Sequence, residues 1–204
     1  MSPIVGLIIS YLAGSIPSAY ISGRLRGVDL RKHGSGNLGA TNDVRVLGVK
    51  TGAVVFIADL LKGFLPVYFL PRYTETLRPG MWALFFGAAA IIGHVKPIFL
   101  LWQGGGKGVA TASGVFLALA PIPMLVAEVV WIVTFYFSRY VSLASLLGAT
   151  VLPIAILAWY RSPQSPVFLA SVVIAVFVFW THRANIGRLR RGQEHRFVKK
   201  EMAG

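Results

Sequence analysis

Cysteine is absent from the 204 residues of this chain. Disulfides, thiolate zinc sites, iron–sulfur clusters and cysteine nucleophiles are therefore excluded. Acidic residues are also scarce: Asp and Glu together number 7, and charged residues of both signs make up only 13% of the chain. A soluble domain carries about 25% charged residues, so this shortage of charge argues against a water-soluble fold.

Hydrophobic residues are correspondingly abundant: they make up 55% of the chain, and the mean hydropathy is +0.68. The single core of a soluble protein of this length cannot bury so many apolar side chains, so the composition predicts an integral membrane protein. The 20 Lys and Arg residues give a net charge of +13. On a membrane protein such an excess indicates cytoplasmic loops, anionic headgroups or a phosphorylated substrate before it indicates nucleic acid.

Apolar segments divide the chain into seven predicted spans. The stretch between Thr111 and Phe137 is too long for one span of about 20 residues, and Pro121 and Pro123 mark a turn between two shorter ones. The N-terminal segment lacks a basic region and is interpreted as a span, not a signal peptide. The expected spans cover residues 1–21, 51–71, 80–100, two segments between 108 and 137, 141–160 and 166–181. The fold class predicted is all-α, a polytopic membrane helix bundle forming one domain over residues 1–204.

Basic residues orient this bundle. With seven spans, sixteen of the 20 Lys and Arg residues fall in loops on one side, and only Arg72, Arg78 and Arg161 fall on the other. The positive-inside rule then places the N-terminus outside and the C-terminus in the cytosol. Seven spans also collect the polar segments on one face, whereas six would split them.

The first polar segment, HGSGNLGATN at residues 33–42, contains a G-x-G-x-x-G pattern. A dinucleotide-binding fingerprint needs a strand before it and a βαβ unit around it, with an acidic residue about 20 positions later. Here a charged stretch precedes the glycines, and the acidic residue at that distance, Asp59, lies in an apolar span. The dinucleotide interpretation is therefore rejected. What remains is a glycine-rich loop with small hydrogen-bond donors, suited to bringing backbone N–H groups to an anion. A flexible loop between spans is the alternative, but a cluster of polar and basic side chains favours a site: Ser35, Asn37, Thr41, Asn42 and Arg45.

The second polar segment consists of Gly93 and His94 followed by QGGGKGVAT at residues 103–111. It is not a Walker A loop, because Lys107 is followed by glycine and the spacing of the glycines is wrong. Glycines that open a helix nevertheless point free N–H groups and the positive end of the dipole at one spot, here beside a lysine. The pattern predicts a phosphate site at the membrane surface; the alternative is a lysine that only reaches headgroups.

Shorter polar features complete the pattern. HRANIGR at residues 182–188 is either a lipid-anchored basic tail or a helix end whose His182 and Asn185 face inward together. Ser142 and Ser145 begin the sixth span, as caps or as functional hydroxyls. Asp59 and Lys62, three residues apart within a span, are expected to pair with each other or with neighbours.

Taken together, GSIPSAY at 14–20, the segments at 33–42 and 93–111, and HRANI at 182–186 with Gly192 and Glu194 resemble the motifs of the bacterial acyl-phosphate:glycerol-3-phosphate acyltransferases, the PlsY family. The resemblance covers essentially the whole chain. It implies a seven-helix inner-membrane enzyme of phospholipid biosynthesis with a cytosolic active site. Such an enzyme moves a fatty acyl group from acyl phosphate to the 1-hydroxyl of glycerol 3-phosphate. Gln103 departs from the basic residue expected before the glycines.

The residues suit this chemistry. Both substrates carry phosphate, and the attacked carbonyl needs an oxyanion site that backbone N–H groups or polar side chains can supply. Catalytic roles are expected for Ser35, Lys107, Ser142, His182 and Asn185. The phosphates are expected to contact Ser35, Gly36, Asn37, Thr41, Asn42, Arg45, Gly105, Gly106, Lys107, Arg183, Arg188 and Glu194, with Glu194 also orienting basic residues of the tail.

The general base stays open between His182 and an oxygen of a substrate phosphate, and the second is favoured because the loops are poor in bases. His33 and His94 are weaker candidates. No histidine is followed by aspartate five residues later, the pattern that acyl-CoA-dependent glycerolipid acyltransferases use. Neither a metal nor a cofactor is expected. The expected partners are acyl phosphate, glycerol 3-phosphate and membrane lipids, without nucleic acid; a monomer is the working expectation, and the acyl-chain length stays open.

Three other classes fit less well. A transporter for organic phosphate usually shows internal repeats and a site at the bilayer midplane, and neither is evident here. A CDP-alcohol phosphotransferase needs clustered aspartates for Mg²⁺. A lipid-binding scaffold leaves the two glycine-rich segments without a purpose.

Overall fold

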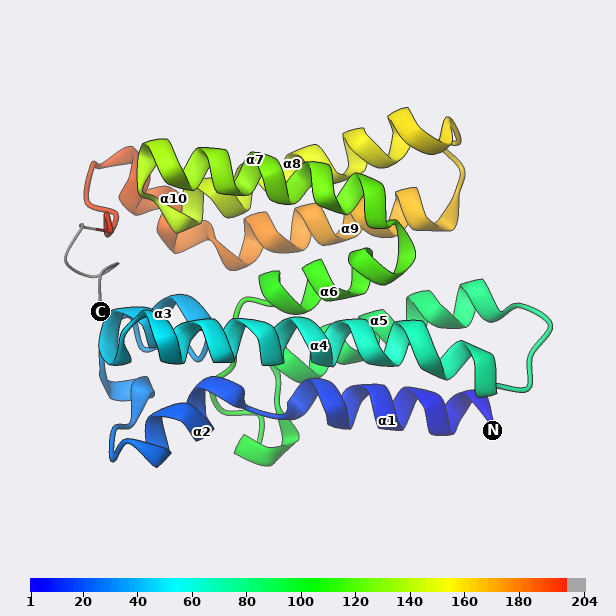
Figure 1. Cartoon of the computed structure of the whole chain (residues 1–204), viewed down its shortest axis with the longest axis horizontal. Coiled ribbons are helices and arrows are strands. Elements are labelled where there is room, and N and C mark those ends of the chain that lie inside the picture. The colour runs from blue at the N-terminus through cyan, green and yellow to red at the C-terminus, as the bar shows by residue number, and fades with distance from the viewer. Residues whose placement is uncertain (198–204) are drawn as a thin grey trace. The chain divides into compact units, whose positions relative to one another are not determined.

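A computed structural model describes residues 1–197, which are helical and contain no strand (Figure 1). These residues form two compact units, unit 1 from Met1 to Leu119 and unit 2 from Ala120 onward. Each unit has its own helix packing. That residues 1–204 make one domain stays a prediction, and residues 198–204 of that range lie outside the described residues.

Unit 1 is built on three long helices. α1 (Pro3–Ser15), α4 (Val49–Tyr73) and α5 (Pro79–Val95) pack against one another, and α6 (Val109–Leu119) packs on α4 and α5 (Figure 1). Shorter elements surround one end of α4: α2 (Ser18–Leu25), η1 (Leu30–Lys32) and α3 (Ala40–Leu47). η2 (Ile98–Leu100) lies between α5 and the glycine-rich segment.

Glycines set how closely the helices of unit 1 approach. A Cβ added at Gly63 of α4 would lie 2.1 Å from the carbonyl oxygen of Thr111, and one added at Gly114 of α6 would lie 2.0 Å from that of Leu60. The α1–α5 crossing is equally close, because a Cβ at Gly14 would lie 2.1 Å from the carbonyl oxygen of Ala90. Small residues allow this backbone-to-backbone packing, which replaces the hydrophobic effect where helices associate in lipid.

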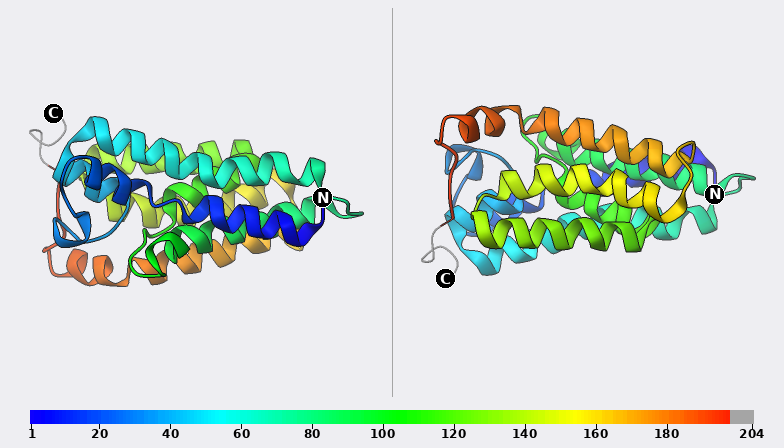
Figure 2. Two further views of the ribbon diagram at one scale, coloured as in Figure 1. Left: turned by 90° about the horizontal axis from the view of Figure 1, so that it is seen from below. Right: turned by 90° about the horizontal axis from the view of Figure 1, so that it is seen from above.

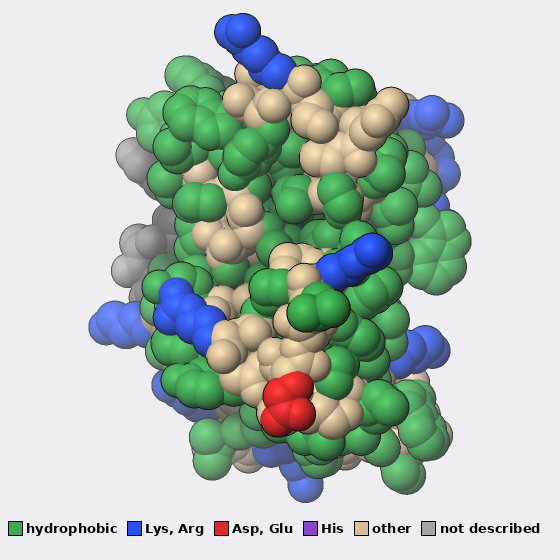
Figure 3. Space-filling view, turned by 90° about the vertical axis from the view of Figure 1, so that its right-hand side faces the viewer, with side chains coloured by type: hydrophobic (Ala, Val, Ile, Leu, Met, Phe, Trp, Pro, Cys, Tyr) green, Lys and Arg blue, Asp and Glu red, His purple; other side chains and the backbone are tan. Residues whose placement is uncertain are grey.

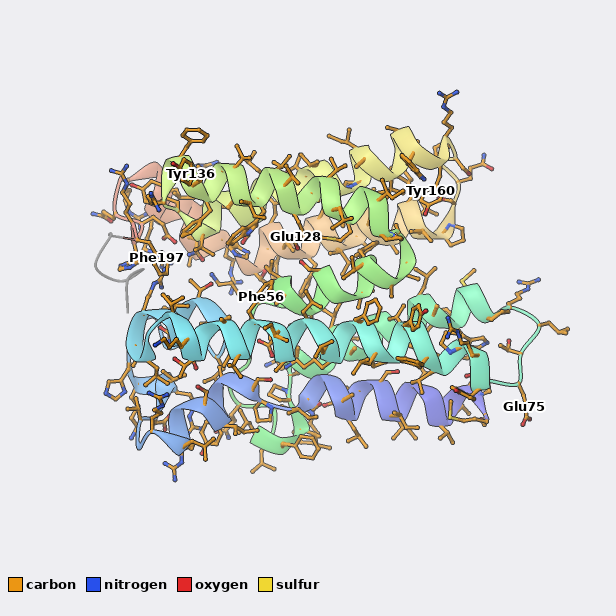
Figure 4. The ribbon with its side chains drawn as sticks, viewed as in Figure 1. Phe56, Glu75, Glu128, Tyr136, Tyr160 and Phe197 are labelled. Atoms are coloured by element: carbon orange, nitrogen blue, oxygen red, sulfur yellow. The ribbon has the colours of Figure 1, made fainter. Side chains whose placement is uncertain are left out.

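Unit 2 is an antiparallel set of helices, in which α8 (Val141–Tyr160) lies between α7 (Pro121–Ser138) and α9 (Pro166–Thr181) (Figure 2). α7 and α9 each have a proline in the first turn, and α9 is also capped by Ser165, which accepts a hydrogen bond from the amide of Phe168. α10 (Arg183–Arg190) bends from α9 by 59° at His182. The segment after α10 returns to the end of α7, where the amide of Phe197 donates to the carbonyl of Arg139 and its ring meets Phe135 edge-on (Figure 4).

Apolar helices occupy all seven of the predicted positions, and α8 and α9 have the predicted bounds. Five segments are long and apolar enough to cross a membrane, and a sixth qualifies if α9 and α10 count as one bent span. α6 has only 11 residues, or about 16 Å of helix, against a hydrocarbon core of about 30 Å. The turn expected at Pro121 is present, since α6 ends at Leu119 and α7 begins at Pro121.

Large hydrophobic side chains are exposed along these helices, Ile4, Ile57 and Val173 among them. Helix flanks of this kind are stable when lipid covers them, and would aggregate in water. Figure 3 looks instead onto the end where the N-terminus lies, and there Lys, Arg and acidic side chains stand among the hydrophobic ones.

Candidate active site

The first polar segment is a turn held by one amide. Asn42, at the start of α3, accepts a hydrogen bond from the amide of Ser35 at 2.7 Å and donates to the carbonyls of Leu30 and His33 at 3.2 and 3.1 Å. Gly34 has a φ of +60°, and a Cβ there would meet the oxygen of the Asn42 amide. The glycine is therefore required by both conformation and space. Asn42 is nearly fully buried, so its amide shapes the loop that presents Ser35.

The first and second polar segments meet. Nδ2 of Asn37 donates to the carbonyl oxygen of Gly105 at 3.1 Å, across 68 residues of sequence. Because a backbone carbonyl in a glycine-rich loop is otherwise left to water, this bond fixes the second loop relative to the first. Two segments predicted separately to bind phosphate thus form one loop pair in unit 1.

The second polar segment leads directly into α6. Gly104 and Gly108 have φ values of +78° and +81°, so residues with a side chain would be strained at either position. The amide of Gly106 donates to the carbonyl oxygen of His94 at 3.3 Å, which folds the loop back onto the end of α5. Lys107 is half-buried two residues before the first residue of α6. This is the predicted arrangement of glycine backbone, lysine and helix start.

Other predicted phosphate contacts of unit 1 lie on or beside α3. Ser35 is exposed, and Thr41 and Arg45 are half-buried on the helix. Asp43 on the same helix is fully buried. Burial raises the pKa of the Asp43 carboxyl, and the hydroxyls of Ser22 and Thr51 offset that rise only in part.

Unit 2 contains a cluster organised by one carboxylate. Oε1 of Glu194 accepts hydrogen bonds from Ser142 at 2.9 Å and from Nδ2 of Asn185 at 2.6 Å. Its Oε2 accepts from Nε of Arg188 at 2.7 Å. The predicted contact between Glu194 and a basic residue of the tail is therefore present. The chain brings together the start of α8, the turn after α10 and α10 itself through this one side chain.

The charge of Glu194 is stabilised where it lies. Burial opposes ionisation, but hydrogen bonds from Asn185, Arg188 and Ser142 outweigh it and hold the pKa of Glu194 below its ordinary value. An ionised carboxylate accepts hydrogen bonds only, which suits three donors. Four of the residues predicted from sequence thus belong to one hydrogen-bonded group.

His182 is buried at the bend between α9 and α10, next to this cluster in sequence. Its Nδ1 lies 2.8 Å from the carbonyl oxygen of Val178. Because a carbonyl only accepts, this contact places a proton on Nδ1. Arg183 instead turns back on Trp180, donating to its carbonyl at 3.1 Å and lying over its ring.

The expected pairing of Asp59 with Lys62 is confirmed, with Oδ1 and Nζ 2.8 Å apart. What sequence reasoning did not connect is that His94 belongs to the same group, its Nδ1 lying 3.7 Å from the same oxygen. The sequence feature that could have pointed to this group is the carboxylate of Asp59 within an apolar span, since such a group needs polar partners nearby. Within residues 1–197, no three His, Asp or Glu side chains gather as metal ligands would.

The chain is similar to known proteins over nearly its whole length. A family model described as glycerol-3-phosphate acyltransferase matches residues 4–192. The chain is 42% identical over 192 residues to a glycerol-3-phosphate acyltransferase of Fusobacterium nucleatum, covering 94% of this chain and 96% of that protein. It is 44% identical over 192 residues to that of Aquifex aeolicus, covering 94% and 97%.

Two solved structures are similar over nearly the whole chain. Both are crystal structures of PlsY, an integral membrane glycerol 3-phosphate acyltransferase. The glycerol 3-phosphate form is 39% identical with a TM-score of 0.88, covering 98% of this chain and 97% of that one. The lysophosphatidic acid form is 38% identical with a TM-score of 0.83 and the same coverage.

Proposed function

The chain belongs to the glycerol-3-phosphate acyltransferase family, an integral membrane family of phospholipid synthesis, and on this premise we propose the reaction in full. The protein transfers a fatty acyl group from acyl phosphate to the 1-hydroxyl of glycerol 3-phosphate. The hydroxyl oxygen attacks the acyl carbonyl, the bond between that carbonyl and the phosphate oxygen breaks, and the hydroxyl proton passes to a base. The products are 1-acyl-glycerol 3-phosphate and phosphate.

The observation that carries this proposal is the bond between Asn37 and the carbonyl of Gly105. It joins the two glycine-rich loops beside Lys107, at the start of α6. A helix start and an ammonium group together suit a phosphate by dipole and charge. An acyl phosphate presents that group, whereas the thioester end of acyl-CoA does not.

We assign the roles unit by unit. In unit 1, Asn42 shapes the first loop through its hydrogen bond with the amide of Ser35. Phosphate is bound there by residues of both loops and of α3: Ser35, Gly36, Asn37, Thr41, Arg45, Gly105, Gly106 and Lys107. Ser35 and Lys107 also stabilise charge on the reacting carbonyl, where one donor contributes about 3–4 kcal/mol. In unit 2, Glu194 holds Ser142, Asn185 and Arg188 in place for the substrate. Arg183 supplies positive charge in unit 2, from its position against Trp180.

For the base, we favour a phosphate oxygen of the substrate, whose second pKa of about 6 suits proton acceptance near neutral pH. His182, buried at the bend between α9 and α10, is the alternative. His182→Gln distinguishes the two. If the histidine is the base, kcat should fall by at least about 100-fold and the acidic limb of the pH–rate profile should vanish. If phosphate is the base, the limb stays.

The donor is tested with purified protein in detergent. Palmitoyl phosphate and glycerol 3-phosphate should yield lysophosphatidic acid, whereas palmitoyl-CoA and palmitoyl-loaded acyl carrier protein should not. Efficient turnover with the thioesters would overturn the proposed donor while leaving the family assignment intact.

We also propose seven membrane segments in the bacterial inner membrane, with the N-terminus outside and the site facing the cytosol. The distribution of Lys and Arg supports this orientation. Because the chain has no cysteine, single thiols report topology without background. Glu75→Cys, exposed in the loop after α4, should react with an impermeant maleimide in intact cells, and Gln193→Cys only after permeabilisation. The reverse labelling pattern would show that the orientation is inverted.

We also expect the protein to be a monomer, which light scattering of the purified protein tests.

A further inference from the structure

Three ionisable side chains meet in the interior of unit 1. Asp59, Lys62 and His94 have side chains that are 2%, 7% and 5% exposed. Asp59 lies near the middle of α4, in a segment otherwise suited to lipid, and His94 lies one residue before the end of α5. A charged group in such a place is costly, and so demands a purpose.

The group links three helices. Lys62 pairs with Asp59 at 2.8 Å and also donates to the carbonyl oxygen of Ile16 at 2.8 Å, at the break between α1 and α2. Oδ1 of Asp59 lies 3.7 Å from Nδ1 of His94, beyond hydrogen-bonding distance. The His94 ring therefore lies beside a buried carboxylate of another helix, and the two groups interact as nearby charges or dipoles in a medium of low dielectric constant.

The other side of the His94 ring meets the glycine-rich loop at residues 103–108, hereafter the phosphate loop. A Cβ added at Gly106 would lie 1.9 Å from Nε2 of His94, so only glycine fits over the ring. The carbonyl of the same histidine accepts the amide of Gly106. The neighbouring Gly105 packs on the backbone of His94 and Val95, where its own Cβ would lie 2.2 Å from the Val95 carbonyl oxygen. The loop thus rests on the end of α5.

We propose that Asp59 and His94 are positioning residues for the phosphate loop. They act through the packing of Gly106 on the ring of His94. The ligand whose binding they support is a phosphate, either that of the acyl donor or that of glycerol 3-phosphate. Lys62 neutralises Asp59 and anchors the pair to the α1–α2 break. This inference rests on the proposed function, because it assigns the loop to a phosphate of that reaction.

The test measures kcat, the KM of each substrate, and inhibition by inorganic phosphate. Asp59→Asn and His94→Asn should each raise one KM and the inhibition constant of phosphate by about tenfold or more, with a smaller change in kcat. The KM that rises identifies which phosphate the loop holds. Glu75→Gln is the matched control: it removes a carboxylate that pairs with the N-terminal amine at 3.1 Å, and should change neither constant (Figure 4).

Double-mutant cycles separate positioning from packing. Asp59→Asn and His94→Asn should be non-additive, since they break one support. Gly106→Ala displaces the same ring. The double variant Gly106→Ala/His94→Asn should therefore have a KM and a phosphate inhibition constant close to those of Gly106→Ala alone, or partly restored toward wild type. Additive effects in both cycles would overturn the proposal.

A folding defect is handled by a second variant. Asp59→Asn alone leaves Lys62 buried without its partner, so Asp59→Asn is also made together with Lys62→Met, which removes both charges. Wild-type KM and phosphate inhibition in a folded double variant would overturn the inference, as would losses that follow the folded fraction alone. An inactive wild-type protein would instead contradict the proposed function. The two failures are thus distinct.

Discussion

The two polar clusters of this chain are built by different means. In unit 1 the loop pair is made mainly of backbone: glycines, one asparagine bridge from Asn37 to Gly105, and a helix start beside Lys107. In unit 2 the cluster is made of side chains around Glu194, which accepts from Ser142, Asn185 and Arg188. Backbone amides bind an anion without bringing their own countercharge, whereas a carboxylate orients donors and must itself stay ionised. The first design suits binding of phosphate, and the second suits rigid placement of polar groups.

Removing the charge beside the backbone loop should have the largest effect. Lys107→Ala should lower kcat at least about 100-fold, or about 2.7 kcal/mol, because negative charge moves onto the departing phosphate during the reaction. Lys107→Arg should rescue poorly, since a planar guanidinium does not replace a compact ammonium in a glycine-lined loop. Initial rates on purified protein measure both. Lys50→Ala, an exposed lysine at the start of α4, is the control. A folded Lys107→Ala variant with near wild-type turnover would reduce this lysine to a headgroup contact.

Filling the backbone loop should have the next largest effect. Gly106→Ala should lower kcat/KM by about 30-fold, because its Cβ would displace the loop from His94 by roughly an ångström. Gly80→Ala makes the same change in the first turn of α5, where nothing lies within 4 Å, and should keep full activity. Steady-state kinetics and the melting temperature of both variants decide the matter. Equal kinetics in the two would mean that the loop tolerates side chains.

Neutralising the side-chain cluster should reduce activity less and make stability less dependent on pH. Glu194→Gln should lower kcat/KM by about tenfold. The lowered pKa of Glu194 means that its contribution to stability is full above its ordinary pKa of 4.5 and is lost as pH falls through the folded-state pKa. The melting-temperature gap between wild type and variant should thus be widest near pH 7 and shrink below pH 4.5.

Glu75→Gln, at an exposed carboxylate, controls for general acid effects on stability. A melting-temperature difference between wild type and Glu194→Gln that is constant from pH 7 to pH 3 would show that Glu194 does not hold its charge through these contacts.

Cutting the bridge between the loops should have a modest effect. Asn37→Ala removes one hydrogen bond worth about 1 kcal/mol and should raise a substrate KM by about fivefold. Substrate titrations measure the change. Asn37→Asp is the sharper variant, because it replaces the donor with an acceptor facing the Gly105 carbonyl and should be worse than alanine. An aspartate that works as well as asparagine would mean that the two loops are held together by other contacts.

Chelation should have no effect. Asp and Glu number only 7 in the chain, and Glu194 and Asp59 already pair with Arg188 and Lys62, so too few carboxylates are left to hold a divalent ion. Activity should survive EDTA. Loss on chelation that one particular ion restores would contradict this expectation, and would require ligands that neither cluster supplies.

Much of this architecture was predictable from local sequence. The helices at 141–160 and 166–181 have their predicted bounds, because Arg139, Arg161 and Pro166 interrupt apolar runs whose lengths suit the membrane. The break before Pro121 was predicted for the same kind of reason. The length of α6 was not: its 11 residues begin after a glycine loop whose extent is decided by contacts with α5. Composition does not report where such a loop ends.

Local sequence is enough to predict an all-helical fold, a membrane environment and the polar segments, because hydropathy, proline and charge act over a few residues. Which of these segments meet depends on long-range packing. Asn37 and Gly105 are 68 residues apart, and Asp59 reaches His94 from another helix. Those contacts depend on helices crossing closely at Gly14, Gly63 and Gly114, and so on backbone packing that no short stretch of sequence specifies.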